Sequence, residues 1–264
     1  MDLGLKGKSA VVSGSTAGIG FAIAALLAEE GAHVVVNGRT EARVAEALKK
    51  IRAGGKHVNV RGVAADLGTA EGVEKFVAEV SAADVLINNL GIFEPKPFMD
   101  IPDADWLRFF EVNVLSGVRL ARAYLPGMLK KNWGRIIFVS SESGQQIPAE
   151  MVHYGMTKTA QIAVARGLAE SVAGTGVTVN SVLPGPTASE GVEGFVQELA
   201  KQQGISKSEI EKQFFSTARP SSLLKRFETP EEIAAVVAFV ASTQSVTING
   251  SAVRAEGGVV RSIL

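Results

Sequence analysis

The feature that most constrains this chain is an alternation of short β-branched apolar runs with longer amphipathic stretches over its first three quarters. Several of the apolar runs, such as "DVLINN" and "RIIFVSS", carry little polar alternation, which is typical of strands covered on both sheet faces. Strands and helices that alternate through short connections predict a parallel, doubly wound α/β sheet. The expected strands are 9–13, 33–37, 58–64, 84–89, 135–141, 177–183 and 251–255, with helical patterns near 18–30, 41–53, 70–82, 103–130, 154–174 and 230–242.

The segment 187–229 breaks this rhythm, because it contains two helical patterns and no strand. Val192, Phe195, Val196 and Leu199 share one face of the first pattern, and Ser206 with Glu209 fits a capping box at the start of the second. The excursion leaves the carboxyl end of a strand, where open α/β sheets bind ligands. We therefore predict a helical lid over the substrate, with a plain structural insertion as the alternative. Its larger apolar side chains, which either meet an apolar substrate or belong to the core, are Phe195, Phe214, Phe215, Leu223 and Leu224.

The composition of the 264 residues excludes several classes of function. A formal net charge of +0 gives no electrostatic basis for binding nucleic acid or an anionic membrane. The chain has no cysteine, and its three histidines (His33, His57 and His153) show no ligand-like spacing, so no metal site is expected. No stretch resembles a signal peptide or spans a bilayer, and no linker, low-complexity tract or repeat is found. We expect a soluble, cytoplasmic protein with a single domain over 1–264.

A glycine-rich loop, "SGSTAGIG", follows the first predicted strand and leads into a helix. Gly14, Gly18 and Gly20 allow a tight turn and a close approach of the backbone, so that the helix N-terminus can hold a pyrophosphate. A simple backbone turn is the alternative, since glycine loops alone are weak signals. Its position in the first strand–helix unit of a doubly wound sheet favours nucleotide binding.

The end of the second strand, "VVVNGRTEAR", bears on which nucleotide is bound. A carboxylate there would hold the ribose 2′-hydroxyl of NAD, but the nearest following acid is Glu41, already in the next helix. Arg39 can hold a 2′-phosphate with its planar fork, and Ser15 and Thr16 could add hydroxyl donors. NADP(H) is therefore favoured over NAD(H), unless Arg39 is only a solvated loop charge.

Tyr154 stands four residues before Lys158 at the head of a predicted helix, so both side chains share one helical face. The pair could be a solvated surface contact. Alternatively, the Lys158 ammonium could lower the pKa of the Tyr154 phenol, which would let it exchange a proton near neutral pH.

These segments together resemble the short-chain dehydrogenase/reductase family over essentially the whole chain. The resemblance rests on "SGSTAGIG", "AADL", "NNLG", "EVNVLSG", "VSSESG", "YGMTK", "VNSVLPGPT" and the late "EGG", in family order and at family spacing. It implies a Rossmann-type fold, a nicotinamide cofactor, and hydride transfer between that cofactor and a carbonyl or secondary alcohol.

The resemblance also implies roles for four residues, and it favours the catalytic interpretation of the tyrosine–lysine pair. Ser141 would hydrogen-bond the substrate oxygen, and Tyr154 would give or take its proton. Lys158 would hold the nicotinamide ribose and favour the phenolate. Asn113 would help to hold a water that passes protons from Lys158 to solvent.

Further family positions imply cofactor contacts, with Asp66 reaching the adenine amino group unless it only caps its loop. These positions are Ile19, Asp66, Leu67, Asn89, Gly91, Pro184, Gly185 and Thr187. Family members are commonly tetramers or dimers built on the 103–130 and 154–174 helices and the C-terminal segment, so a homo-oligomer is expected.

Within the family, the 3-oxoacyl-thioester reductases have the most similar pattern, in "GRIIFVSS" and "VTVNSVLPGP". Docking of acyl carrier protein is not favoured, because Asn132 and Thr175 stand where such reductases place basic residues. Leu90, Glu256 and Ala17 also depart from the usual family residues, and Ala17 leaves Arg39 without a second cation. The alternatives are an NAD-dependent alcohol dehydrogenase of the sugar-alcohol or sterol type, and a non-catalytic nucleotide-binding regulator.

Overall fold

The computed structural model describes residues 1–54 and 58–263, apart from the side chain of Phe195, so the predicted role of the Phe195 side chain, as substrate contact or core, lies outside the described residues. The described chain forms one seven-stranded parallel sheet in the order β3-β2-β1-β4-β5-β6-β7. The strands are β1 (Ser9–Val12), β2 (His33–Gly38), β3 (Asn59–Ala64), β4 (Val85–Asn88), β5 (Gly134–Val139), β6 (Val177–Pro184) and β7 (Ala252–Ala255). The predicted doubly wound α/β fold is confirmed, and each strand lies within two residues of its expected bounds.

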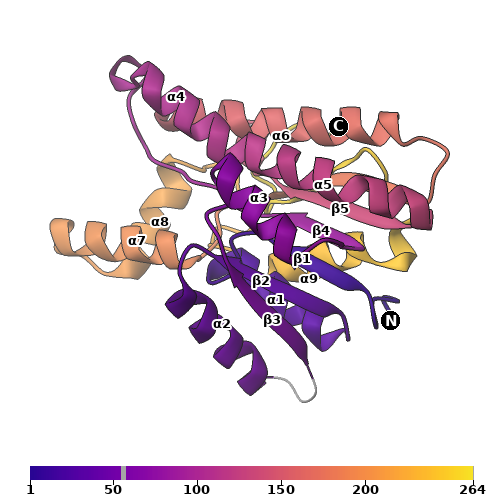
Figure 1. Ribbon diagram of the computed structural model, residues 1–264. Helices are drawn as coiled ribbons and strands as arrows, with labels where there is room; N and C mark the ends of the chain where they lie inside the picture. Colours follow the sequence, from indigo (N-terminus) through magenta and orange to yellow (C-terminus); the bar gives the residue numbers. More distant parts are fainter. Residues whose placement is uncertain (55–57, 264) are drawn as a thin grey trace.

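Helices cover both faces of the sheet (Figure 1). One core lies under α1 (Gly18–Glu29), α2 (Glu41–Gly54) and α9 (Pro230–Ala241). The other lies under α3 (Ala70–Glu79), α5 (Ser116–Lys131) and α6 (Val152–Ser171). Because both faces are covered, every residue of β4, β5 and β6 is buried, which accounts for the apolar runs in their sequences.

The predicted helix over 103–130 is interrupted. It divides into α4 (Asp103–Phe110), a π-helical turn (Glu111–Leu115) and α5. Asn113 lies in the π turn, and its side chain accepts from the Ile92 N–H (2.7 Å) and donates to the Ile92 carbonyl (3.0 Å) and to Thr157 Oγ1 (3.0 Å). Such π turns inside helices occur often at functional sites. Amphipathic periodicity does not reveal the turn, because helices on both sides keep the same buried face.

The 187–229 segment contains α7 (Glu190–Gln203) and α8 (Lys207–Thr217), which project beyond the sheet (Figure 1). The predicted capping box is confirmed, since Ser206 accepts from the Glu209 N–H and Glu209 accepts from the Ser206 N–H. α8 packs through an aromatic cluster of Phe214, Phe215 and Phe227, whose ring centroids lie 5.1–5.2 Å apart.

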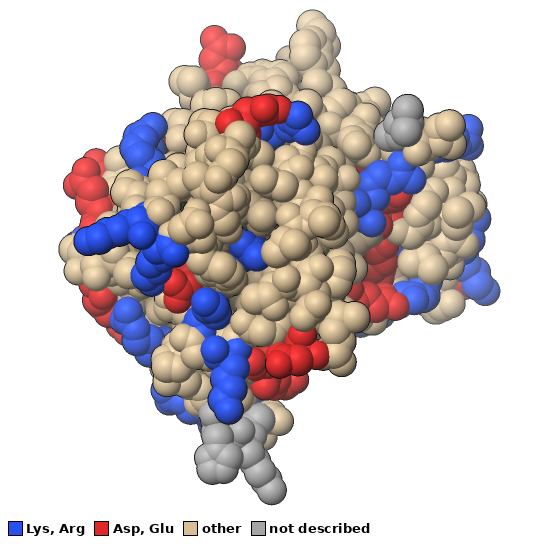
Figure 2. Space-filling model, turned by 90° about the vertical axis from the view of Figure 1, so that its right-hand side faces the viewer, with Lys and Arg blue, Asp and Glu red and all other residues tan. Residues whose placement is uncertain are grey.

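The surface shows the balance of charge expected from the sequence. On the face drawn in Figure 2, Lys and Arg are interspersed with Asp and Glu, and wide areas carry neither sign. Among the described residues, no helix has the length and apolar character needed to cross a membrane.

The glycine loop folds back against the end of β4, and this contact leaves no room for a side chain at Gly20. A Cβ at Gly20 would lie 2.3 Å from Asn89 Nδ2 and 2.5 Å from the Gly14 carbonyl. Gly14 and Gly18 have φ of 60° and 55°, in the left-handed region that glycine adopts without strain.

We expect Gly20→Ala to destabilise the protein by about 2–4 kcal/mol, because the β1–α1 loop must separate from Asn89. Gly167→Ala is the matched control, since Gly167 is an exposed glycine within α6 and a Cβ there meets nothing within 4 Å. Ala has the higher helix propensity, so the control should gain about 0.5–1 kcal/mol. Urea unfolding of both variants measures the difference, and equal stabilities would contradict the packing described for Gly20.

Candidate active site

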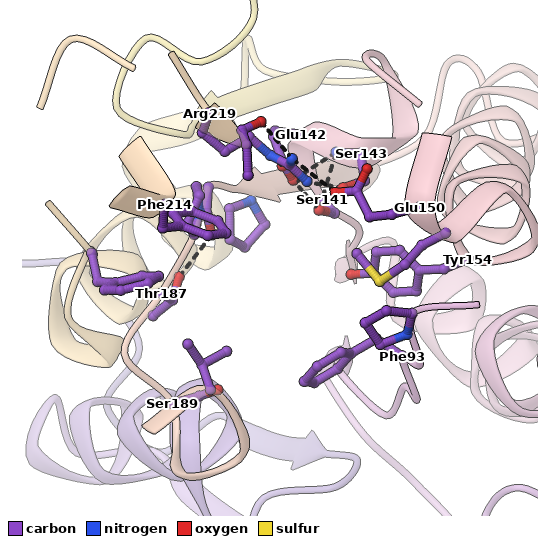
Figure 3. A pocket seen from close by; sticks show the side chains of 18 of the residues that line it. Phe93, Ser141, Glu142, Ser143, Glu150, Tyr154, Thr187, Ser189, Phe214 and Arg219 are labelled. Carbon is purple, nitrogen blue, oxygen red and sulfur yellow. Dashed lines mark hydrogen bonds and ion pairs between the residues drawn. The ribbon is translucent and has the colours of Figure 1, made fainter. Parts of the chain in front are cut away.

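A cavity of about 580 Å³ opens at the carboxyl edge of the sheet, between the strand ends and the 187–229 segment. Its polar wall comes from the β5–α6 region, and its apolar wall comes largely from α7 and α8 (Figure 3). Of the residues predicted for the site, the cavity brings together Ser141, Tyr154, Lys158, Ile19, Asn89, Gly91, Pro184, Gly185 and Thr187. Residues more than 150 positions apart in the sequence therefore line one space.

Tyr154 is partly buried at the start of α6, beside the ring of Phe93 in an edge-on contact (centroids 6.4 Å apart; Figure 3). Burial raises the pKa of the Tyr154 phenol well above its ordinary value, and the nearby Glu142 carboxylate raises it further. A hydrogen bond from Ser141 and the charge of Arg219 act in the opposite direction but do not offset this rise. The phenol is therefore neutral at neutral pH.

Lys158 is not among the groups that shift the pKa of Tyr154 here, so the expectation that it lowers this pKa beside a nicotinamide stays a prediction. Lys158 Nζ lies 5.6 Å from the centre of the Tyr154 ring and donates instead to the Val139 carbonyl (3.0 Å) and to Gln161 Oε1 (3.1 Å). Burial lowers the pKa of the Lys158 ammonium to about 8. The Lys158 ammonium thus lies over the Tyr154 ring while its hydrogen bonds go to Val139 and Gln161.

Gln161 is a member of this network that the sequence reasoning missed. Its side chain is buried, and its Nε2 donates to the Asn113 carbonyl (2.6 Å) while its Oε1 accepts from Lys158. Asn113 and Lys158, which the family resemblance connects through a water, are here joined by an amide side chain. The available signal was position, because Gln161 follows Lys158 by three residues and so shares its helical face.

A buried ion pair lies beside Ser141. Glu142 Oε1 accepts from Arg219 Nε (2.8 Å), and Glu142 Oε2 accepts from Ser141 Oγ (2.5 Å) and from the Ser143 N–H (2.7 Å). Arg219 Nη1 also donates to Glu150 Oε1 (3.1 Å), as Figure 3 shows. Arg219 lies just after α8, so the ion pair connects the 187–229 segment to the carboxyl edge of the sheet. The sequence reasoning missed all three charged residues of this cluster.

The glycine loop fits a nucleotide pyrophosphate. α1 begins at Gly18, and its N-cap residue, Ala17, forms no side-chain capping bond. The N–H groups of the first helical turn are therefore left for an anion, in a position where the helix dipole favours negative charge.

The Ser15 hydroxyl is not placed to donate to a 2′-phosphate, as the sequence had suggested. Its hydroxyl donates to the Val12 carbonyl (2.6 Å) and accepts from the Asn37 N–H (2.9 Å), and its own N–H donates to the Asn37 carbonyl (2.8 Å). Since Ser15 is fully buried and its donors are used, it cannot offer a hydroxyl to a phosphate. Its role is to join the glycine loop to β2. The side chain of Thr16, in the same loop, lies beside the end of β2 against Gly38.

Two predicted cofactor residues lie at the ends of the neighbouring strands. Arg39 is exposed just after β2, and it takes part in none of the ion pairs found within residues 1–54 and 58–263. Asp66 is exposed after β3, where its Oδ1 accepts from the Gly68 N–H (3.0 Å), so it does cap its loop. Leu67 is buried in the core, which leaves only its backbone to meet a ligand.

The loop after β6 is held by a residue that the sequence did not suggest. Glu228 is buried, and its Oε2 accepts from the Gly185 N–H (3.0 Å). Burial raises the pKa of Glu228 to about 7. Thr187 Oγ1 donates to the Gly185 carbonyl (3.0 Å), so the predicted residues Gly185 and Thr187 form one braced turn at the cavity. In the described part of the chain, no group of three or more His, Asp or Glu side chains is arranged to hold a metal ion.

Comparison with known proteins places the chain in a family. The short chain dehydrogenase family model matches residues 8–200. The oxidoreductase YvaG of Bacillus subtilis is 48% identical over 263 residues, covering 100% of both chains. D-β-hydroxybutyrate dehydrogenase of Cupriavidus necator is 33% identical over 97% of this chain and 99% of the relative. The structure of L-sorbose reductase from Gluconobacter frateurii, complexed with NADPH and L-sorbose, matches with a TM-score of 0.94 at 34% identity, covering 100% of both chains.

The cavity, the glycine loop and these similarities have one explanation: the chain belongs to the short-chain dehydrogenase/reductase family, oxidoreductases that act on CH–OH groups with NAD(P).

Proposed function

We propose that this protein is an NADP(H)-dependent ketone reductase in which Ser141, Tyr154 and Lys158 carry the chemistry. The observation that supports this most strongly is their convergence on one wall of the cavity, next to the loops that fit the cofactor. The protonated state of Tyr154 supports the direction, because a neutral phenol can donate its proton to a ketone oxygen. Alcohol oxidation would need the phenolate.

In this proposal the residues have separate tasks. When bound, the nicotinamide supplies the hydride for the carbonyl carbon. Tyr154 donates its proton to the carbonyl oxygen, and Ser141 donates a hydrogen bond to the same oxygen as negative charge develops there. For this, the Ser141 hydroxyl must rotate away from Glu142, its acceptor in this structure. Lys158 holds the nicotinamide ribose, and Asn113 with Gln161 keeps Lys158 in place.

NADP(H) is proposed as the cofactor because of the glycine loop and Arg39. Gly14, Gly18 and Gly20 give the backbone of the phosphate loop, and the end of β2 carries no carboxylate to repel a 2′-phosphate, the nearest following acid being Glu41 in α2. Arg39 is exposed and lacks a carboxylate partner among the described ion pairs, so its fork can receive the phosphate. The sorbose reductase similar to this chain was solved with NADPH, which is consistent with this choice.

The segment 187–229 is proposed to cover the substrate, since α7 and α8 contribute much of the apolar cavity wall. The substrate is proposed to be a ketone or its secondary alcohol. The relatives suggest two chemistries: one is named for a hydroxy acid, and the other was solved with a ketose. A 3-oxoacyl thioester is a further candidate, by the resemblance of the sequence to that branch.

A homo-oligomer is proposed as the working form. Several large apolar side chains are exposed on the surface of α4 and near the C-terminal strand, where a second copy could cover them. They include Leu107 (71% exposed), Phe110 (37%) and Leu223 (82%).

The first prediction concerns Tyr154. Tyr154→Phe removes the proton donor, so kcat for ketone reduction should fall by about 10²- to 10⁴-fold while NADPH binding changes by less than about twofold. Tyr124→Phe is the matched control, since Tyr124 is the other tyrosine and its hydroxyl only donates to the Val80 carbonyl (2.8 Å). It should lose about 1 kcal/mol of stability and keep its activity. Turnover that survives Tyr154→Phe would refute the mechanism.

The second prediction concerns the cofactor. Arg39→Ala should weaken NADPH binding about 10- to 100-fold, the loss of one charge-assisted contact, and leave NADH binding nearly unchanged. Fluorescence titration of both cofactors at fixed salt measures this. Arg166→Ala, at an exposed arginine on α6, should affect neither cofactor. Tighter binding of NADH than NADPH by the unaltered protein would overturn the assignment of Arg39.

The third prediction concerns pH. Alcohol oxidation requires the phenolate of Tyr154, so its rate should rise as pH passes the pKa of this phenol. Because Glu142 raises that pKa, Glu142→Gln should move the rising limb of the oxidation profile to lower pH. Steady-state rates from pH 6 to 11 with a saturating secondary alcohol test this. A limb that stays in place, or moves to higher pH, would show that Glu142 does not act on Tyr154.

A further inference from the structure

Four charged side chains line the cavity among the described residues: Glu142, Glu150, Lys158 and Arg219. Lys158 lies beneath the proposed ribose position and is held by Val139 and Gln161. The other three form a separate group on the substrate side, where Figure 3 shows Arg219 between the two carboxylates. We take this group, named the acid–arginine cluster, as the charge that a bound substrate meets.

The acid–arginine cluster carries two negative charges and one positive charge. Both carboxylates use the same guanidinium, Glu142 through Nε (2.8 Å) and Glu150 through Nη1 (3.1 Å). Glu142 and Arg219 are almost fully buried, with side-chain exposures of 5% and 9%, whereas half of the Glu150 side chain is exposed. Arg219 is therefore already neutralised, and one negative charge remains in excess within the acid–arginine cluster.

The charges nearest to this cluster do not cancel the excess. The loop that precedes α4 and the start of α4 carry Glu94, Lys96, Asp105 and Arg108, which pair with one another. Lys96 adjoins Glu150 through its backbone, whose N–H donates to the Glu150 carbonyl (2.9 Å). Two charges of each sign leave this neighbouring group neutral.

The remainder of the substrate side is apolar. α7 contributes Val192, Val196 and Leu199, and the α8 region contributes Ile210, Phe214 and Phe227. A substrate carboxylate beside the acid–arginine cluster would lose its hydration, find the one cation of the cluster, Arg219, already paired with two carboxylates, and face their excess negative charge. A neutral substrate would incur none of these costs.

We propose that the acid–arginine cluster makes this site selective for neutral ketones with an apolar arm, and that it excludes ketones that carry a carboxylate. The inference rests on the proposed function and deepens it by naming the substrate class. Of the two substrate chemistries that the relatives suggest, a hydroxy acid and a neutral ketose, the cluster favours the neutral one.

The test compares pairs of substrates of nearly equal shape, in which a neutral amide replaces a carboxylate. The pairs are 4-acetylbenzamide with 4-acetylbenzoate, and 4-oxopentanamide with 4-oxopentanoate. NADPH oxidation gives kcat/KM for each compound, and the amide-to-carboxylate ratio is the readout for each protein. We expect a ratio of about ten or more for the unaltered protein.

Glu150→Gln removes one negative charge with little change of shape, and it should lower this ratio about fivefold. Glu46→Gln is the matched control, because Glu46 is exposed on α2 and pairs only weakly with Lys50 (3.8 Å). The control should leave the ratio unchanged.

A ratio near or below one, or a high ratio that Glu150→Gln does not lower, would overturn the charge selection and leave ketone reduction standing. Equal lowering by Glu46→Gln would also overturn it, since the effect would then reflect net charge alone. Reduction of none of the four compounds by any of the three proteins would refute the proposed function, and with it the inference.

Discussion

The pairing of β4 with β1 is the constraint on which the candidate site depends. The chain leaves β3 at one edge of the sheet and returns to the middle, so β1 has β2 on one side and β4 on the other. At this point the connections from the strands run in opposite directions, and their carboxyl ends leave a crevice. Asn89 closes the base of the crevice, because its Nδ2 donates to the Ser13 and Gly14 carbonyls (3.0 Å each). Asn37 supports the other side, with its Oδ1 accepting from the Gly14 N–H (3.1 Å).

The chemistry of the site reflects two competing demands on one small region. In the proposed mechanism Ser141 must donate a hydrogen bond to the substrate and Tyr154 must transfer a proton, but neighbouring groups hold several polar atoms of this region in fixed hydrogen bonds. The Gln161 side chain bonds to Lys158 and to the Asn113 carbonyl at the same time, and Glu142 accepts the hydrogen bond of the Ser141 hydroxyl. An amide side chain has no proton that titrates near neutral pH, so Gln161 can orient Lys158 but is a poor carrier of protons. The phosphate loop, in contrast, is rigid at its base and open at the N-terminus of α1, as anion binding requires.

The fold could be predicted from the sequence because the signals were local. A continuous apolar run marks a buried strand whatever its partners, and the capping box of α8 lies within four residues. Ser141, Tyr154 and Lys158 could be located for a different reason, the resemblance of their motifs. The acid–arginine cluster could not, because Arg219 meets Glu142 across 77 positions, and a single sequence contains no sign of such a contact. Ser15 was misassigned because its type suits a phosphate donor, whereas only the packed structure shows that its hydroxyl is directed at Val12. The π turn at Asn113 was missed because one extra residue in a turn barely changes the periodicity of the apolar face.

Arg219 belongs to the 187–229 segment, and Glu142 follows β5 at the carboxyl edge of the sheet, so their ion pair joins two parts of the fold that are far apart in the sequence. The cation of this pair lowers the pKa of Tyr154 and its anion raises it. Any outward displacement of the excursion would withdraw the cation alone, and the phenol would then hold its proton more tightly. By thermodynamic reciprocity, ionisation of the phenol must draw the excursion inward with the same free energy. The position of the 187–229 segment and the acidity of the Tyr154 phenol are thus coupled through Arg219.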